Sequence, residues 1–271
     1  MNILLTITKL TPLLILSYLL TALQVQADEE VSDWAFHTVL GWAWRDIDGT
    51  LFSHEPPLTG AATTDSLGLG SSSEPTAVIG ARWKRFSAEF VYLPSKFSGE
   101  GYLHQSIDLG PGPIIDTNTP IKSDLEVTMM LADIQYAIIK RSNMEIGVGA
   151  GAGQVDLDIA MIPAVGPEVN VSGTVPFGYL TVTFLKRWDK LVFNLGAQGL
   201  SVSKGENSVS YNSANAVLGY RVYQRGSLGF DVIAGYRYVN FEYTFDDNHS
   251  DARSSTDFEL KGPNVALRML W

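Results

Sequence analysis

The stretch SLGFDVIAGYRY, which runs from Ser227 to Tyr238, alternates between two sets of side chains. One set comprises Leu228, Phe230, Val232, Ala234, Tyr236 and Tyr238, and the other comprises Gly229, Asp231, Gly235 and Arg237. A period of two puts successive residues on opposite faces of a β-strand, whereas on a helix it scatters the apolar groups around the circumference. The stretch therefore predicts a strand with one apolar face and one polar face.

The same alternation recurs along the rest of the chain. The segments that carry it are 36–46, 77–83, 88–92, 130–138, 144–153, 191–198, 214–221 and 264–271. Most are close to the length of ~10 residues that crosses a bilayer at a tilt. The pattern predicts an all-β chain of membrane-crossing length.

The connections between these segments differ in length. Short turns with basic residues lie at 84–85, 140–143, 186–190 and 224–226. Longer loops rich in Gly, Pro, Ser, Thr and Asp lie at about 49–73, 98–123, 159–172, 204–208 and 246–255. Short turns alternating with longer loops are typical of bacterial barrels. We count ten strands with both termini on the short-turn, periplasmic side, and eight or twelve are the alternatives because bulges blur boundaries.

The first residues have the features of a secretory signal peptide. Lys9 supplies a positive charge, residues 13–20 an apolar core, and Val25-Gln26-Ala27 the small residues of a cleavage site. The apolar run 11–23 is shorter than the ~20 residues of a membrane helix. We therefore predict a cleaved signal peptide at 1–27 and an outer-membrane β-barrel domain at 28–271.

Composition excludes several classes of protein. The chain has no cysteine and a net charge of −10, which becomes about −11 when the leader with Lys9 is removed. Such an acidic chain without a basic cluster is not expected to bind nucleic acid. We expect no cofactor and no metal. Beyond the leader no apolar stretch is long enough for a membrane helix, so a membrane crossing requires a closed barrel.

A soluble β-sandwich is the competing fold, because its strands also alternate. Aromatic residues near strand ends favour the barrel, since interfacial girdles occupy that position. These residues are Trp34, Trp42, Trp44, Trp83, Trp188, Tyr220, Tyr223, Tyr236, Tyr238 and Trp271. The prediction is a closed antiparallel transmembrane β-barrel.

The last strand carries a resemblance to a known class of proteins. Val265, Leu267, Met269 and Trp271 share one parity, and the segment resembles the terminal strand of bacterial outer-membrane proteins, which ends on an aromatic residue. Residues 235–238 and 260–263 are similar to the last hairpin of small proteobacterial barrels of the OmpA-like and porin-like type. The resemblance implies the outer membrane of a Gram-negative bacterium, with its lipid and lipopolysaccharide as surroundings, and the barrel-assembly machinery as a partner. It implies no activity, and we expect a monomer.

Charged residues fall on the parity opposite to the apolar face. By this criterion the lumen receives Arg45, Arg82, Glu89, Asp133, Glu145, Arg221, Asp231, Arg237 and Arg268. An arginine facing lipid at the midplane costs ~2–4 kcal/mol, so these side chains belong inside. Five arginines nearly balance four carboxylates, which favours a salt-bridged core filling a narrow lumen. A polar path for a small solute is the alternative.

A catalytic site is a further alternative. Asp46 and Asp48 end the first strand, and Asp247 and His249 begin the last long loop; a closed barrel makes these strands neighbours. An Asp–His pair beside a second Asp pair can activate water. The pattern is similar to that of the omptin proteases, although their pairs face each other across the barrel. The other interpretation is that these loop tips are solvated or loosely bind a divalent cation.

The function predicted from the sequence is a non-enzymatic surface protein, structural or adhesive. The alternatives are a narrow channel for small solutes and an omptin-like or lipid-modifying hydrolase at the extracellular rim.

Overall fold

The computed structural model describes residues 34–54, 60–102, 118–204, 207–247 and 252–271. The leader predicted at 1–27 lies outside the described residues. The strands are β1 (Trp34–His54), β2 (Gly60–Thr63), β3 (Ser72–Trp83), β4 (Phe86–Tyr102), β5 (Pro120–Arg141), β6 (Met144–Pro163), β7 (Val169–Trp188), β8 (Leu191–Lys204), β9 (Asn207–Arg225), β10 (Leu228–Asp247) and β11 (Ala252–Leu270). Among the residues described, no helix is long and apolar enough to cross a membrane.

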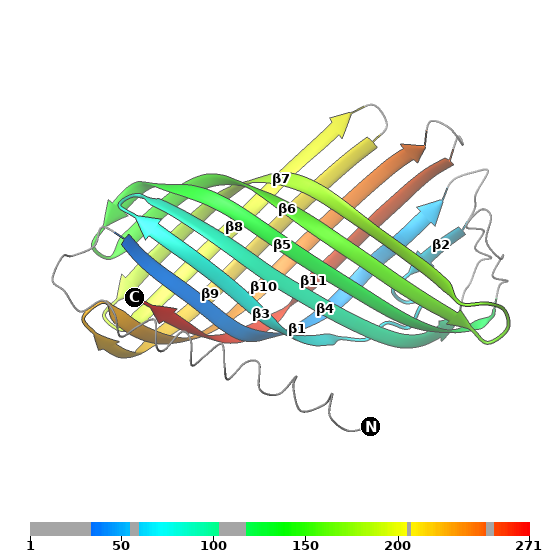
Figure 1. Ribbon diagram of the computed structural model, residues 1–271, viewed down its shortest axis with the longest axis horizontal. Coiled ribbons are helices and arrows are strands. Elements are labelled where there is room, and N and C mark those ends of the chain that lie inside the picture. The colour runs from blue at the N-terminus through cyan, green and yellow to red at the C-terminus, as the bar shows by residue number, and fades with distance from the viewer. Residues whose placement is uncertain (1–33, 55–59, 103–117, 205–206, 248–251) are drawn as a thin grey trace, which may run out of the picture. The chain divides into compact units, whose positions relative to one another are not determined.

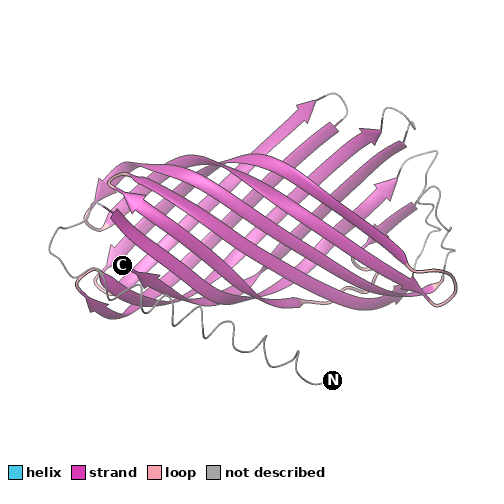
Figure 2. Cartoon of the chain, viewed as in Figure 1, coloured by secondary structure: helices cyan, strands magenta, loops and turns pink. Residues whose placement is uncertain are grey.

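Ten of these strands form a closed antiparallel ring (Figures 1 and 2). β3 pairs with β1 and β4, each of β4 to β10 pairs with its neighbours in chain order, and β11 pairs with β10 and back onto β1. The predicted closed barrel of ten strands is thereby confirmed. Following the paired residues once around the ring from Trp34 leads back to Asp46, twelve residues farther along β1. Such a stagger tilts the strands and lets the sheet close on itself.

The C-terminal residue closes the seam of the barrel. The backbone N–H of Phe36 donates to the carbonyl of Trp271 at 2.8 Å, and the N–H of Trp271 donates to the carbonyl of Phe36 at 3.1 Å. The two rings also stack, with centroids 6.3 Å apart. Val265 and Leu267, on the same parity, are exposed on the outer face of β11.

The strands are longer than the sequence indicated. Five of them have 20 residues or more, and they continue through segments that we expected to be loops. Ile159, Met161 and Val169, for example, belong to the predicted loop 159–172 but are buried strand residues. The predicted loop 49–73 also contains β2, which pairs only with the far end of β1. The loop prediction was wrong there, because Gly, Ser and Asp also occur on the water-exposed face of a β-strand.

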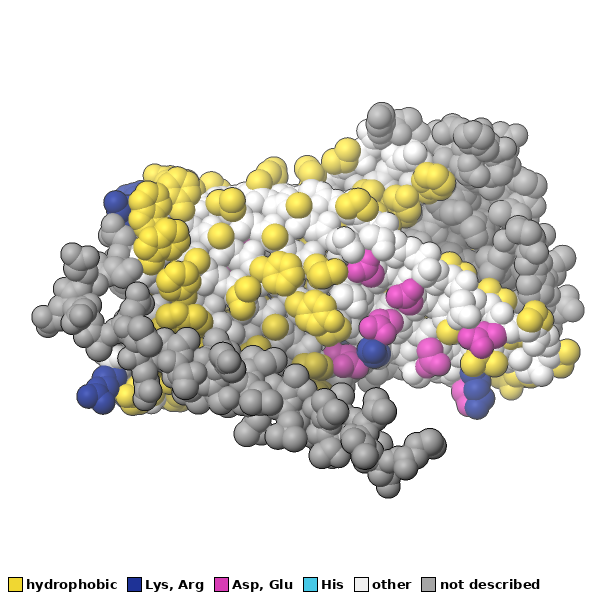
Figure 3. Space-filling model, in the orientation of Figure 1, with side chains coloured by type: hydrophobic (Ala, Val, Ile, Leu, Met, Phe, Trp, Pro, Cys, Tyr) yellow, Lys and Arg dark blue, Asp and Glu magenta, His cyan; other side chains and the backbone are white. Residues whose placement is uncertain are grey.

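In the longer strands, polar and apolar residues exchange faces partway along, although successive side chains continue to point alternately inward and outward. Near the short turns, Ile134 of β5 points outward and is 64% exposed, while Asp133 is buried inside. Farther along the same strand, Leu125 and Val127 are buried inside and Glu126 faces outward. The barrel therefore has an apolar outside with a polar interior at one end, and a polar outside with an apolar interior at the other. Figure 3 shows the apolar outer surface near the C-terminus and acidic side chains beyond it.

Two ladders in the wall stop before their strands end. Pairing between β7 and β8 stops at Leu180 and Gly199, although β7 begins eleven residues earlier at Val169. In Figure 1, β8 and β9 diverge from β7 beyond that point. Pairing between β3 and β4 stops at Ala77 and Tyr92. The end of the barrel away from the short turns, here called the extended end, therefore has gaps in the backbone pairing between neighbouring strands, whereas the end at the short turns is paired throughout.

Candidate functional site: the charged layer inside the barrel

The charged layer occupies the interior at the short-turn end of the barrel. Its centre is Asp231 of β10, which is fully buried and binds two arginines. Arg268 donates to one carboxylate oxygen from Nε at 2.9 Å and from Nη2 at 2.5 Å, and Arg221 Nε donates to the other. The side chains come from β9, β10 and β11, three strands adjacent in the ring. One buried carboxylate therefore ties three strands together.

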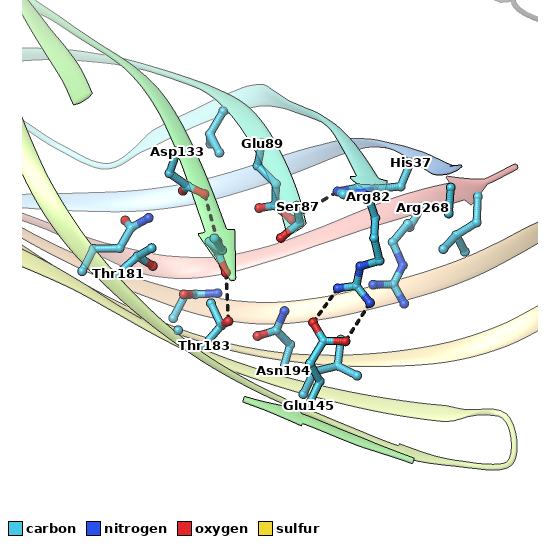
Figure 4. A pocket seen from close by; sticks show the side chains of 18 of the residues that line it. His37, Arg82, Ser87, Glu89, Asp133, Glu145, Thr181, Thr183, Asn194 and Arg268 are labelled. Carbon is cyan, nitrogen blue, oxygen red and sulfur yellow. Dashed lines mark hydrogen bonds and ion pairs between the residues drawn. The ribbon is translucent and has the colours of Figure 1, made fainter. Parts of the chain in front are cut away.

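A second ion pair crosses the lumen. Arg82 of β3 donates from Nη1 and Nη2 to the two carboxylate oxygens of Glu145 on β6, each at 2.7 Å (Figure 4). A bidentate pair of this kind is directional as well as strong. Because β4 and β5 separate β3 from β6 in the sheet, the pair links two non-adjacent strands of the wall through the interior.

The middle of the layer holds two carboxylates, each with its own polar partners. His37 Nε2 lies 3.3 Å from the Glu89 carboxylate. The Asp133 carboxylate accepts from Gln135 Nε2 at 2.9 Å and from the Tyr179 hydroxyl at 3.3 Å. Thr183 Oγ1 donates in turn to Gln135 Oε1 at 2.9 Å. The Asp133 carboxylate is thus held by neutral donors, not by a cation.

Arg45 lies where the charged layer meets the apolar core, and it binds a backbone carbonyl and a hydroxyl group in place of a carboxylate. Its Nη1 donates to the carbonyl of Pro94 at 2.5 Å and to Ser95 Oγ at 2.7 Å. Both acceptors lie on β4, just beyond the point where pairing with β3 ends at Tyr92. The guanidinium therefore satisfies polar groups next to a gap in the ladder.

A cavity of about 220 Å³ opens within this layer, and Arg82, Glu89, Asp133, Asn194, Arg237 and Arg268 are among its lining residues. A second cavity of about 160 Å³ shares Glu89, Arg237 and Arg268 with it and adds Arg45. The first cavity also touches Ala35 and Leu270, which lie close to the ends of β1 and β11. The space is therefore at the short-turn end of the barrel.

An apolar core fills the interior beyond the cavities. Its largest fully buried side chains are Tyr179, Tyr211, Phe97, Phe241, Phe258, Leu51, Leu67, Leu125, Met129 and Leu131. Phe177 packs against Tyr211 with ring centroids 4.6 Å apart and against Phe241 at 5.7 Å. These contacts link β7, β9 and β10 across the extended end of the barrel.

All nine charged residues that parity assigned to the lumen are found in or beside this interior layer. Two functional neighbours were missed. His37 has an unremarkable sequence context, and its partner Glu89 is fifty-two positions away. Arg187 was assigned to a basic turn, but it lines the larger cavity. Arg187 is two residues after Leu185, which lines the same cavity, so a period of two would have placed Arg187 inside the barrel.

The residues of the hydrolase alternative are not brought together in the described part of the chain. Asp46 and Asp48 are exposed on the outer face of β1, where their strand partners are Lys261 and Glu259. Asp247 pairs with Ala252 at the end of β10, and its side chain lies outside what the structure describes. His249 lies outside the described residues. The hydrolase remains a prediction that these positions do not test.

Comparisons with known proteins find only distant similarities, to bacterial outer-membrane proteins. No protein-family model matches the chain, and no curated protein matches it in sequence. The outer membrane protease OmpT from Escherichia coli is 10% identical over 91% of this chain and 99% of its own, with a TM-score of 0.47. The translocator domain of the autotransporter NalP from Neisseria meningitidis is 12% identical over 96% of each chain, at 0.36. The outer membrane protein AlkL is 13% identical over 91% of this chain and 93% of its own, at 0.37. Similarities this distant assign no activity.

Proposed function

We propose that this protein is a non-conducting β-barrel of the bacterial outer membrane that acts through the part of its wall projecting outside the cell. The observation that carries the proposal is the apolar core, which occupies the interior at the end farthest from both described chain ends. Water and polar solutes have no continuous path through tightly packed aromatic and aliphatic side chains. A closed interior leaves the outer surface as the place where the protein meets other molecules.

The outer face supports placement in a membrane. Exposed aromatic residues near the short turns include Trp34, Trp83, Phe86, Trp188 and Tyr223, and a second row includes Trp42, Trp44, Tyr92 and Tyr236. Trp34 and Trp44 are ten residues apart on β1, which corresponds to a height of about 25 Å for a strand tilted by about 40°. That height matches the apolar band of an outer-membrane barrel between its aromatic girdles.

Beyond the second row the outer face becomes acidic. Asp48 lies directly opposite Glu259, Glu242 opposite Asp257, and Glu126 opposite Asp158. Lys96 Nζ lies 3.0 Å from Glu126, which raises the pKa of that lysine. We infer that this acidic face contacts cationic surfaces, that outer-membrane lipid and lipopolysaccharide surround the apolar band below it, and that the protein works as a monomer. The final strand is inferred to be the part that the assembly machinery binds.

Single cysteines test the placement, because the chain contains none. Glu242→Cys on intact cells is expected to react rapidly with a water-soluble maleimide, and Val232→Cys, within the apolar band, is expected to stay unlabelled until the membrane is dissolved. Equal labelling of the two positions in intact cells would contradict the outer-membrane placement.

Planar-bilayer recording tests the closed interior. The refolded full barrel is expected to insert without producing conductance steps in molar salt. The control is the variant Phe177→Gly/Phe241→Gly, which removes two side chains that pack against each other in the core and is expected to conduct more than the parent. Regular steps from the parent protein would refute the proposal and restore the channel alternative.

A further inference from the structure

The cavity in the charged layer has an excess of positive charge. Across the two connected cavities the lining includes five arginines, at positions 45, 82, 187, 237 and 268. It includes three carboxylates, those of Glu89, Asp133 and Glu145. The sequence predicted five arginines and four carboxylates in the lumen, and Arg187 adds a further positive charge to that set.

Among the described residues, three lining arginines, Arg45, Arg187 and Arg237, have no carboxylate partner. Two lining carboxylates, those of Glu89 and Asp133, have no arginine partner. Arg82 is neutralised by Glu145, and Arg268 is bound to Asp231. Among the described residues, neither Arg187 nor Arg237 has a carboxylate within the 4.0 Å of an ion pair. Cations in a confined interior are costly unless paired, so the unpaired arginines favour a negative group in the cavity that they line, and Glu89 and Asp133 supply part of that negative charge.

Three buried polar atoms of the lining lack a hydrogen-bond partner. They are Arg237 Nη1, Thr181 Oγ1 and Asn194 Oδ1. Thr181 is only 2% exposed, so bulk solvent does not satisfy it. Buried polar groups are nearly always paired, and a cluster of unpaired ones around one space indicates something that binds there. Guanidinium and hydroxyl groups donate, and an amide supplies a donor when it turns over.

We propose that this cavity binds a small anion through its carboxylate or phosphate oxygens. Guanidinium groups match the planar, paired oxygens of such anions. The cavity of about 220 Å³ is several times the ~30 Å³ share of one water molecule, so it admits more than a single solvent molecule. The apolar core closes its far side, so the anion enters and leaves at the short-turn end. The proposal is independent of the surface role, because it concerns the opposite end of the molecule.

Isothermal titration calorimetry on the folded full chain in detergent micelles tests the proposal. The probes are inorganic phosphate and succinate, titrated separately at constant ionic strength, because surface effects depend on salt. Saturable binding at one site is expected with at least one probe, and the stronger probe identifies the ligand class. Heats that do not saturate for either anion would overturn the proposal and leave water as the occupant.

Variants locate the binding. Arg237→Gln and Arg187→Gln are each expected to weaken binding about tenfold or more, since each removes a charged donor. Arg141→Gln is the matched control, because Arg141 is exposed at the last position of β5, at the same end of the barrel. Equal weakening by Arg141→Gln would assign the binding to the surface and refute the proposal.

A third variant guards against misfolding. Thr181→Val keeps the shape of the side chain and removes the unpartnered hydroxyl, so the barrel is expected to fold and to bind several-fold more weakly. Heat-modifiable migration on gels confirms folding for every variant. Unchanged binding in both Thr181→Val and Arg237→Gln, with the barrel folded, would place the anion elsewhere and also refute the proposal.

Discussion

The substitution Asp231→Asn removes the charge at the centre of the interior layer while keeping the size of the side chain. In the parent, the fully buried carboxylate binds Arg221 and Arg268 together. The amide retains one acceptor oxygen but turns its other atom into a donor, which faces guanidinium groups that also donate. Two arginines are then left close together without a counter-ion.

The expected loss of stability follows from the burial of the three groups. Removing one partner of a buried ion pair costs about 3–5 kcal/mol. The arginine side chains retain 21% and 17% of their exposure, so water entering the cavity solvates part of the freed charge. We therefore expect the lower end of the range, about 3 kcal/mol. With a urea dependence of about 3 kcal/mol per molar, the unfolding midpoint falls by about 1 M.

Urea unfolding in micelles, followed by tryptophan fluorescence, measures this shift. Glu126→Gln is the control, because it breaks an exposed pair with Lys96 whose worth is about 0–1 kcal/mol. The double variant Asp231→Asn/Arg268→Gln is expected to lose less than the sum of the single losses, since the second change removes one of the stranded charges. A midpoint shift for Asp231→Asn no larger than that of Glu126→Gln would refute the reasoning and show that the layer is freely solvated.

Three further expectations concern the wall, the core and the final residue. Gly262→Ala should lower the temperature of heat-modifiable unfolding, because its Cβ would lie 1.9 Å from the carbonyl oxygen of Trp44, whereas Gly173→Ala, with nothing within 4 Å, should leave that temperature unchanged. Phe241→Ala should cost about 3–5 kcal/mol in urea unfolding because it empties a fully buried position; a cost below 1 kcal/mol would mean that the extended end is loosely packed. Removal of Trp271 should reduce the folded protein recovered in the outer-membrane fraction, and recovery equal to that of the full chain would contradict its role in assembly.

The sequence was sufficient to predict the barrel and the side of the wall on which its charges lie. Period-two alternation in 227–238 places Asp231 inside and Val232 outside, as observed. This works because the alternation depends only on local geometry and on the two solvents that a membrane strand meets. The partners of the charges were not predictable, since Arg82 and Glu145 are sixty-three residues apart and meet only through the stagger of the whole ring.

The strand segments at the extended end of the barrel were not predicted from the sequence, for a physical reason. On β10 the inward positions change from Asp231 and Arg237 to Val239 and Phe241, without any change in parity. The outward face of each strand is apolar only up to the point where the polarity reverses. Beyond that point the outward residues include Asp, Ser and Gly, which are also common in loops. These residues still alternate with a period of two, but here the apolar residues are the inward ones.

The reversal has a single cause, and it connects the two ends of the molecule. Within the membrane, lipid surrounds the outside of each strand, so apolar side chains face outward and the interior has to accommodate the polar ones. Above the membrane, water surrounds the outside, and burial of apolar groups drives side chains such as Val239 and Phe241 inward. Burying a polar layer in lipid is least costly where its charges are paired, and among the described residues Arg187 and Arg237 are two arginines without a carboxylate partner. In the proposed function the apolar core closes the barrel against solutes, and the proposed anion site uses the arginines of the polar layer behind that core.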